Sequence, residues 1–199
     1  MRTEKHSVGA SDVRFAALAR MGEVVFRAKD AANLWGMTNQ NTLHTTLSRY
    51  AKAGLLWRLQ NGLYALKNSR EISPHIIGGK ALHRYCYVSM ETVLARAGLI
   101  QQRVPSTTFV SSVSKRFSLA GYNFHSRALS GKYLHNNTGI LNEGGVFVAS
   151  PERAVADMLY FNPRYHFDAH AHIEWDTVRA LEEAIGYPVS RFVKLSTAS

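Results

Sequence analysis

The dipeptide Asn61-Gly62 lies between two short runs of strand-forming residues, 55–60 and 63–66. A two-residue type I′ turn requires positive φ at both central positions, and Asn-Gly meets that requirement at little cost. In the first run Leu55, Trp57 and Leu59 fall on one face of a strand, and Arg58 and Gln60 share the other. The sequence therefore predicts an antiparallel hairpin with Asn61-Gly62 at its tip.

Three helices are predicted before this hairpin. Ser11 can cap the first, which Gly22 ends, and 23–26 reads as a short strand or extended link. The second helix covers 28–35, and after a short break at 36–38 the third covers 39–53. In the third helix Leu43, Leu47, Tyr50 and Ala51 recur with the period of one buried helical face.

The opposite face of the third helix is polar and has no acidic residue. Amides and hydroxyls can hydrogen-bond base edges in a major groove, and cations can take guanine or phosphate. A polar-faced helix followed by a hairpin is the order of a winged helix-turn-helix, whose hairpin is the wing. The candidate DNA-binding residues are Asn39, Gln40, Asn41, Thr42, Thr45, Ser48, Arg49 and Lys52 of the helix, Arg58, Gln60 and Asn61 of the wing, and the flanking cations Arg27 and Lys29.

The charge distribution favours the same region. Residues 1–70 carry 11 Lys and Arg against 4 Asp and Glu, a net of +7, whereas 71–199 carry 13 against 10, a net of +3. A local excess of positive charge attracts a polyanion, and nucleic acid is the usual one. The sequence therefore predicts a DNA-binding domain over 1–70 with double-stranded DNA as its partner.

The rest of the chain is predicted to form a second, mixed domain over 80–199, so that the whole chain is of the α+β class. Polar residues over 68–79, with Pro74 and Gly78-Gly79, are typical of a linker. Strands are expected at 85–88, 107–111, 121–129 and 145–149. Helices are expected after a Ser89 cap, after a Ser150 cap followed by Pro151, and over 175–185 up to Gly186.

Several segments together resemble the AbiEi antitoxins of type IV toxin–antitoxin (abortive-infection) systems. The similar segments are 61–66 (NGLYAL), 87–94 (YVSMETVL) with 97–100 (AGLI), and 149–154 (ASPERA) with 157–160 (DMLY). The resemblance implies an N-terminal winged helix that represses its own operon and a C-terminal domain that antagonises a nucleotidyltransferase-like toxin. It carries no catalytic residues, and the segment after Pro163 departs from the family pattern.

Other kinds of site are less well supported by the spacing. The histidines His166, His170 and His172 cannot all point at one ion from a single regular conformation, so we expect no metal site and no cofactor. Arg153 and Asp157 are spaced i, i+4, which suits an internal ion pair. Two alternatives to a repressor stay open: a metal-dependent nucleic-acid enzyme that uses these histidines, and a winged helix that docks another protein.

Composition limits the cellular setting. The chain has no run of about 18 apolar residues, which a membrane-spanning helix needs, and no apolar segment near Met1 of the kind found in secretory signals. Its single cysteine, Cys86, cannot close an internal disulfide. We therefore expect a cytoplasmic protein that is not an enzyme.

Overall fold

The computed structural model of the protein describes residues 10–190. The chain divides into two compact units, Met1–Ser73 and Pro74–Ser199. Both units combine helices with β-strands, so the α+β class predicted from the sequence is confirmed. Within 10–190 no helix is both long enough and apolar enough to cross a membrane.

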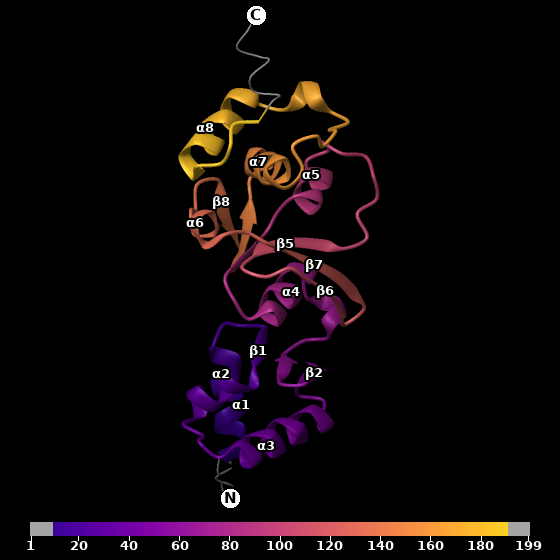
Figure 1. Ribbon diagram of the computed structural model, residues 1–199. Helices are drawn as coiled ribbons and strands as arrows, with labels where there is room; N and C mark the ends of the chain where they lie inside the picture. The colour runs from indigo at the N-terminus through magenta and orange to yellow at the C-terminus, as the bar shows by residue number, and fades with distance from the viewer. Residues whose placement is uncertain (1–9, 191–199) are drawn as a thin grey trace, which may run out of the picture. The chain divides into compact units, whose positions relative to one another are not determined.

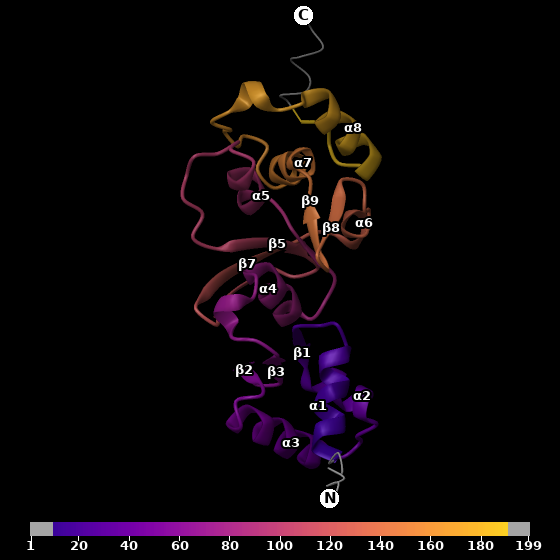
Figure 2. The same ribbon diagram turned by 180° about the vertical axis from the view of Figure 1, so that it is seen from behind.

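The N-terminal unit consists of three helices and a small antiparallel sheet (Figure 1). Strand β3 lies in the middle of that sheet, between β1 and β2 (Figure 2). In chain order its elements are α1 (Ala10–Arg20), β1 (Val25–Arg27), α2 (Ala28–Trp35), α3 (Gln40–Lys52), β2 (Trp57–Gln60), β3 (Leu63–Ala65) and the 3-10 turn η1 (Ser69–Glu71).

The core of this unit forms where the apolar faces of the helices meet β1 and β3. Leu43 and Leu47 of α3 are fully buried with Phe26 of β1. The ring of Tyr50 packs at steep interplanar angles, 73° and 80°, against the rings of Phe15 and Trp35. Because these residues occupy one side of α3, the packing leaves the opposite side of the helix in solvent.

The C-terminal unit is built on a six-stranded mixed sheet in the order β6-β7-β5-β4-β9-β8. The pairs β5–β7 and β4–β9 are parallel, and the other neighbouring pairs are antiparallel. In chain order the elements are α4 (Pro74–Leu82), β4 (Cys86–Val88), α5 (Glu91–Arg96), β5 (Thr107–Ser111), β6 (Lys115–Leu119), β7 (Tyr122–Ala128), α6 (Gly131–Leu134), β8 (Ile140–Glu143), β9 (Val146–Ala149), α7 (Pro151–Phe161), η2 (His170–His172) and α8 (Trp175–Ile185).

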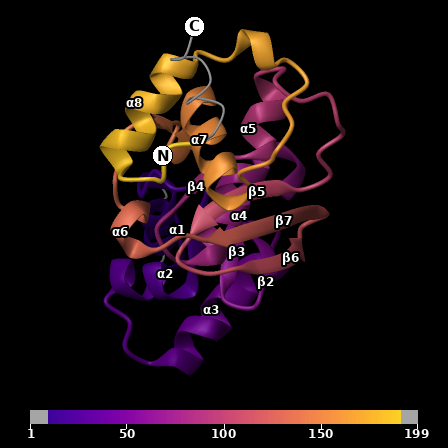
Figure 3. The same cartoon turned by 45° about the horizontal axis from the view of Figure 1, so that its top comes forward.

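Helices cover both faces of this sheet. Helix α4 packs on one face, while α5 and α7 pack on the other and α8 lies against α7 (Figures 1 and 2). Strands β5, β7 and β6 lie side by side at one end of the sheet (Figure 3). Gly78 brings α4 unusually close to its face, because a Cβ at this position would stand 2.6 Å from ring atoms of both Phe109 and Phe124.

Four local predictions need correction. The predicted linker at 68–79 is not irregular, since its first half contains η1 and its second half belongs to α4. Ser89 does not cap α5: the N-cap is Met90, and the Ser89 hydroxyl instead donates to Asp157. Helix α1 begins at Ala10, before the predicted cap Ser11, whose side chain lies outside the described residues. Strands β6 and β8 were not predicted at all.

Candidate nucleic-acid interface

Helix α3 begins with a side-chain cap. The side-chain oxygen of Asn39 accepts a hydrogen bond from the backbone N–H of Thr42 at 3.1 Å, which satisfies a donor that the helix itself cannot pair. The buried Thr46 hydroxyl turns inward and donates to the Thr42 carbonyl at 2.8 Å. The cap therefore fixes where α3 starts and which residues of its first turn remain exposed.

The exposed side of α3 carries amides, hydroxyls, an imidazole and two cations. Gln40, Asn41, Thr42, His44, Thr45, Arg49 and Lys52 are exposed, and Ser48 is half-buried. Every acidic residue of the N-terminal unit lies outside this helix, because the chain has no Asp or Glu between Asp30 and Glu71. The face therefore presents hydrogen-bonding groups and positive charge without a competing carboxylate.

The hairpin β2–β3 carries a second set of polar groups, at and near its tip. Gly62 has φ +72° but Asn61 does not have a positive φ, so the turn is not of the type I′ that Asn61-Gly62 suggested from the sequence. The Gly62 carbonyl accepts a hydrogen bond from the N–H of Ala28 at 2.9 Å. At the tip, the Arg58 guanidinium donates to the Asn61 side-chain oxygen at 3.1 Å. This contact orders a cation at the end of the hairpin while leaving it exposed.

A groove separates the exposed side of α3 from the hairpin. Helix α3 contributes His44, Thr45, Ser48, Arg49 and Lys52, and the hairpin contributes Arg58, Asn61 and Tyr64. Three of these residues are permanent cations and none is acidic. The lining suits an extended anion that also offers hydrogen-bonding groups, which describes a nucleic acid.

The groove brings together Thr45, Ser48, Arg49, Lys52, Arg58 and Asn61 of the residues predicted from sequence. Asn39, Gln40, Asn41 and Thr42 are exposed on the first turn of α3 or at its cap, outside the groove lining. Gln60 follows a bulge in β2 and does not line the groove either.

The two predicted flanking cations lie elsewhere in the N-terminal unit. Arg27 is the N-cap of α2, where its backbone N–H donates to the Asp30 carboxylate at 2.8 Å. Lys29 is exposed on the first turn of the same helix. Neither lines the groove, so any contact they make with a nucleic acid lies outside it.

Two residues of the groove were missed from sequence. His44 follows Asn41 by three positions and precedes Ser48 by four, so the helical period alone places it on the polar face. Tyr64 is only 3% exposed, and its ring stacks on Phe26 with centroids 6.1 Å apart. The structure therefore adds one accessible polar group, His44, and one buried wall residue.

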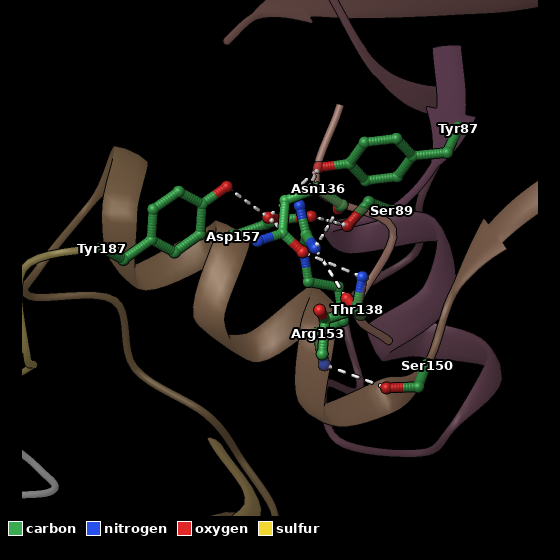
Figure 4. A network of polar contacts seen from close by, with 8 residues as sticks. All are labelled: Tyr87, Ser89, Asn136, Thr138, Ser150, Arg153, Asp157 and Tyr187. Carbon is green, nitrogen blue, oxygen red and sulfur yellow. Dashed lines mark hydrogen bonds and ion pairs between the residues drawn. The ribbon is translucent and has the colours of Figure 1, made fainter. Parts of the chain in front are cut away.

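A buried polar network in the C-terminal unit is the most prominent competing cluster (Figure 4). The side chains of Arg153 and Asp157, both on α7, are fully buried and form an ion pair at 3.0 Å, as their spacing predicted. The Asp157 carboxylate also accepts hydrogen bonds from Tyr87, Ser89 and Tyr187 at 3.3, 2.7 and 2.8 Å. The carboxylate thereby links α7 to β4, to the residue after it, and to the segment after α8.

Each nitrogen of the guanidinium in the same pair also donates a hydrogen bond. Arg153 donates to the carbonyls of Asn136 and Thr138 at 3.0 and 2.7 Å and to the Tyr87 hydroxyl at 2.9 Å. Burial, and then the nearby Asp157 carboxylate, raise the pKa of the Tyr87 and Tyr187 phenols. Because its members are buried and paired with one another, the network holds elements together and leaves no group to receive a ligand.

The histidine segment folds around the 3-10 turn η2. His170 and His172 lie at the two ends of η2, and the ring of His170 packs on Trp175 with centroids 4.6 Å apart. Across the described part of the chain, no three His, Cys, Asp or Glu side chains come together as they would to hold a metal ion.

Comparison of the sequence with protein-family models gave no match, and comparison with curated proteins gave none either.

Proposed function

We propose that this protein is a sequence-specific repressor that binds double-stranded DNA through an N-terminal winged helix-turn-helix. The observation that carries the proposal is the acid-free groove between α3 and the hairpin, with Arg49, Lys52 and Arg58 in its lining. A 13-residue helix with an exposed polar face fits a major groove, and the residues near its N-terminus are those that reach base edges.

The residues divide into two roles in this mechanism. Asn41, Thr42 and Thr45 lie toward the N-terminal half of α3 and read base edges, while Asn39 is committed to the cap. Arg49 and Lys52 near the end of α3, and Arg58 on the wing, neutralise phosphates. Phosphate contacts fix the register of the helix, whereas base contacts supply the sequence preference. Occupancy of a promoter then blocks transcription.

A mobility-shift assay with the full chain and the upstream region of its own operon tests the proposal. We expect a shift that weakens as salt is raised and that competitor DNA of random sequence does not abolish. Thr45→Ala should lower the preference for the specific site, because one good base contact is worth about 1–3 kcal/mol. Arg58→Ala should weaken binding to all DNA sequences alike. It should also reduce by about 1 the slope of log affinity against log salt concentration.

Arg20→Ala is the matched control, because it removes an exposed arginine of the same unit that lies on α1, outside the groove, and is not among the candidate DNA-binding residues. If Arg20→Ala weakened binding as much as Arg58→Ala, general charge and not the groove would be responsible. Pure protein that binds no DNA at low salt would refute the proposal and favour a winged helix that docks another protein. Metal-dependent cleavage of the DNA that His170→Ala abolishes would favour the nuclease alternative.

We further propose that the C-terminal unit acts as the antitoxin against a nucleotidyltransferase-like toxin. Support comes from the resemblance to AbiEi antitoxins together with one structural observation. Two of the similar segments run through β4–α5 and β9–α7, and these elements pack together, with Ser89 donating to Asp157. Co-expression with the product of a neighbouring toxin gene tests this role. Restored growth would support it, and growth arrest despite abundant folded protein would contradict it.

A further inference from the structure

A polar hollow lies on the sheet of the C-terminal unit, over strands β6 and β7. Arg116 pairs with His125 across these antiparallel strands, and Ser118 pairs with Asn123. Side chains two residues apart on a strand point to the same face, so all four project on one side. Phe124 lies between Asn123 and His125 and contacts α4. The four side chains therefore project from the face opposite α4.

Helix α5 covers only part of that face. Thr92 of α5 accepts a hydrogen bond from the N–H of Thr108 at 2.7 Å, which fixes the helix over β5. The neighbouring strands β7 and β6 extend beyond it, so Arg116, Ser118 and Asn123 are exposed and His125 is half-buried. Together with Pro105 and Ser106 these residues line a hollow of about 530 Å³, a size within the usual range of small-molecule sites, about 300–1,000 Å³.

The hydrogen-bonding groups around the hollow are mainly donors. The Asn123 side-chain oxygen already accepts from the Ser118 hydroxyl at 2.7 Å, so its amide N–H groups are left for a ligand. The Arg116 guanidinium forms no ion pair with any carboxylate of the described residues. The hollow has no acidic residue in its lining. A lining that donates hydrogen bonds and carries positive charge is complementary to an anion with several acceptor oxygens.

The charges around His125 also favour an anionic ligand. Burial lowers the pKa of His125, and the neighbouring cations Arg116 on β6 and Arg127 on β7 lower it further, while Glu91 on α5 acts in the opposite direction. The guanidinium of Arg127 lies over the Phe161 ring, 4.3 Å from its centroid. Positive charge around the imidazole therefore outweighs negative charge, and an arriving dianion would relieve this imbalance.

We propose that the hollow binds the phosphate group of a small phosphorylated ligand through Arg116, Asn123 and His125. The planar guanidinium of Arg116 can hold two phosphate oxygens at once, and the Asn123 amide and the His125 ring can donate to the others. Pro105 supplies an apolar wall for the organic part of such a ligand. This site lies in the C-terminal unit and is independent of the groove assigned to DNA.

Titration of the full chain at constant ionic strength tests the site, with inorganic phosphate and adenosine monophosphate as separate probes. Nuclear magnetic resonance of the His125 ring and of the amides of β6 and β7 reports binding at the hollow itself. We expect saturable shifts and a rise in the pKa of His125 on binding. Arg116→Gln should weaken binding by about tenfold or more, as expected for the loss of a charge-assisted pair.

Lys132→Gln is the charge-matched control, since Lys132 is exposed on α6 and does not line the hollow. Tighter binding of the nucleotide than of phosphate would support the proposal and show that the organic part contributes, whereas equal affinity would support a site for the phosphate group alone. The proposal is overturned if neither probe saturates, or if Lys132→Gln weakens binding as much as Arg116→Gln. It is also overturned if Arg116→Gln loses duplex DNA binding but retains both small probes.

Discussion

Addition of one methyl group at each of two adjacent glycines of α4 should have different effects on stability. At Gly78 the new Cβ would stand 2.6 Å from atoms of the Phe109 and Phe124 rings, a distance that the packing cannot accept without movement. At Gly79 the nearest atom, the Sγ of Cys86, would be 3.8 Å away, an ordinary contact. Both positions lie inside the helix, so both substitutions gain the same helical propensity.

The magnitudes follow from this comparison. Replacement of glycine by alanine inside a helix stabilises it by about 0.8–1.0 kcal/mol, and Gly79→Ala should show this gain. Overpacking of a core costs about 1–3 kcal/mol, and Gly78→Ala adds that cost to the same gain. The difference between the two variants removes the propensity and isolates the ring contact. Gly78→Ala should therefore be less stable than Gly79→Ala by about 1–3 kcal/mol.

Native-state hydrogen exchange of the amides of β5 and β7 is the suitable assay, because it reports the opening of this unit separately from the N-terminal unit. These amides should exchange about 5- to 150-fold faster in Gly78→Ala than in Gly79→Ala, since about 1.4 kcal/mol corresponds to a factor of ten. Equal exchange rates in the two variants would refute the close approach of α4 to the sheet.

Two further predictions concern the buried network. Arg153→Ala should lower the free energy of unfolding of the C-terminal unit by about 3–5 kcal/mol in a urea titration, because it leaves a buried carboxylate unpaired. Arg179→Ala breaks an exposed pair of the same i, i+4 spacing and should cost less than about 1 kcal/mol in the same assay. Similar costs for the two would contradict the burial of the network. The raised pKa of Tyr87 and Tyr187 means that the unfolded chain loses these protons first, so stability is retained below pH ~10 and falls above it, by about 1.4 kcal/mol per pH unit for each tyrosine. Tyr187→Phe should remove the contribution of one tyrosine to this loss of stability with pH, measured by unfolding between pH 9 and 11. An unchanged dependence on pH would contradict the prediction.

The elements that sequence reasoning placed well are those with strong local signals. Helices α2 and α8 have the predicted bounds, and each is followed by a glycine in the left-handed conformation, Gly36 and Gly186. Helix α7 begins after Ser150, whose side chain accepts from the N–H of Arg153 as predicted. In these cases a cap and a helical period act within a few residues, so the local sequence contains the relevant information.

The elements that were missed depend on distant contacts. Strands β6 and β8 lie at the two edges of the sheet. Strand β8 (ILNE) has no alternation of apolar and polar residues, and β6 (KRFSL) alternates over only four residues, which is a weak signal of a strand by itself. Gly78 resembled a linker residue because the phenylalanines that require a glycine there are more than 30 positions away along the chain. Ser89 resembled a helix cap because its hydrogen-bond partner, Asp157, is 68 positions away along the chain, beyond the reach of a local sequence pattern.

In the candidate interface, too, residues marked by local sequence patterns were predicted and details that depend on tertiary contacts were not. The helical period and the hairpin turn were enough to select Thr45, Arg49 and Lys52, since these residues depend only on the face of one helix. His44 was within reach of the same rule. The pairing of Arg58 with Asn61 and the bulge that displaces Gln60 depend on how the hairpin closes, and the sequence alone does not specify that detail.

The buried network has a consequence for the order in which the chain acquires its structure during synthesis. The Asp157 carboxylate accepts from the hydroxyl of Tyr187, and the backbone N–H of Ser190 donates to the buried Glu182, so the core of the C-terminal unit is complete only when Ser190 has left the ribosome. The elements of the N-terminal unit that carry the groove end at Ala65. Because domains generally fold as units from the N-terminus during translation, the groove should form while the partners of Asp157 are still being added.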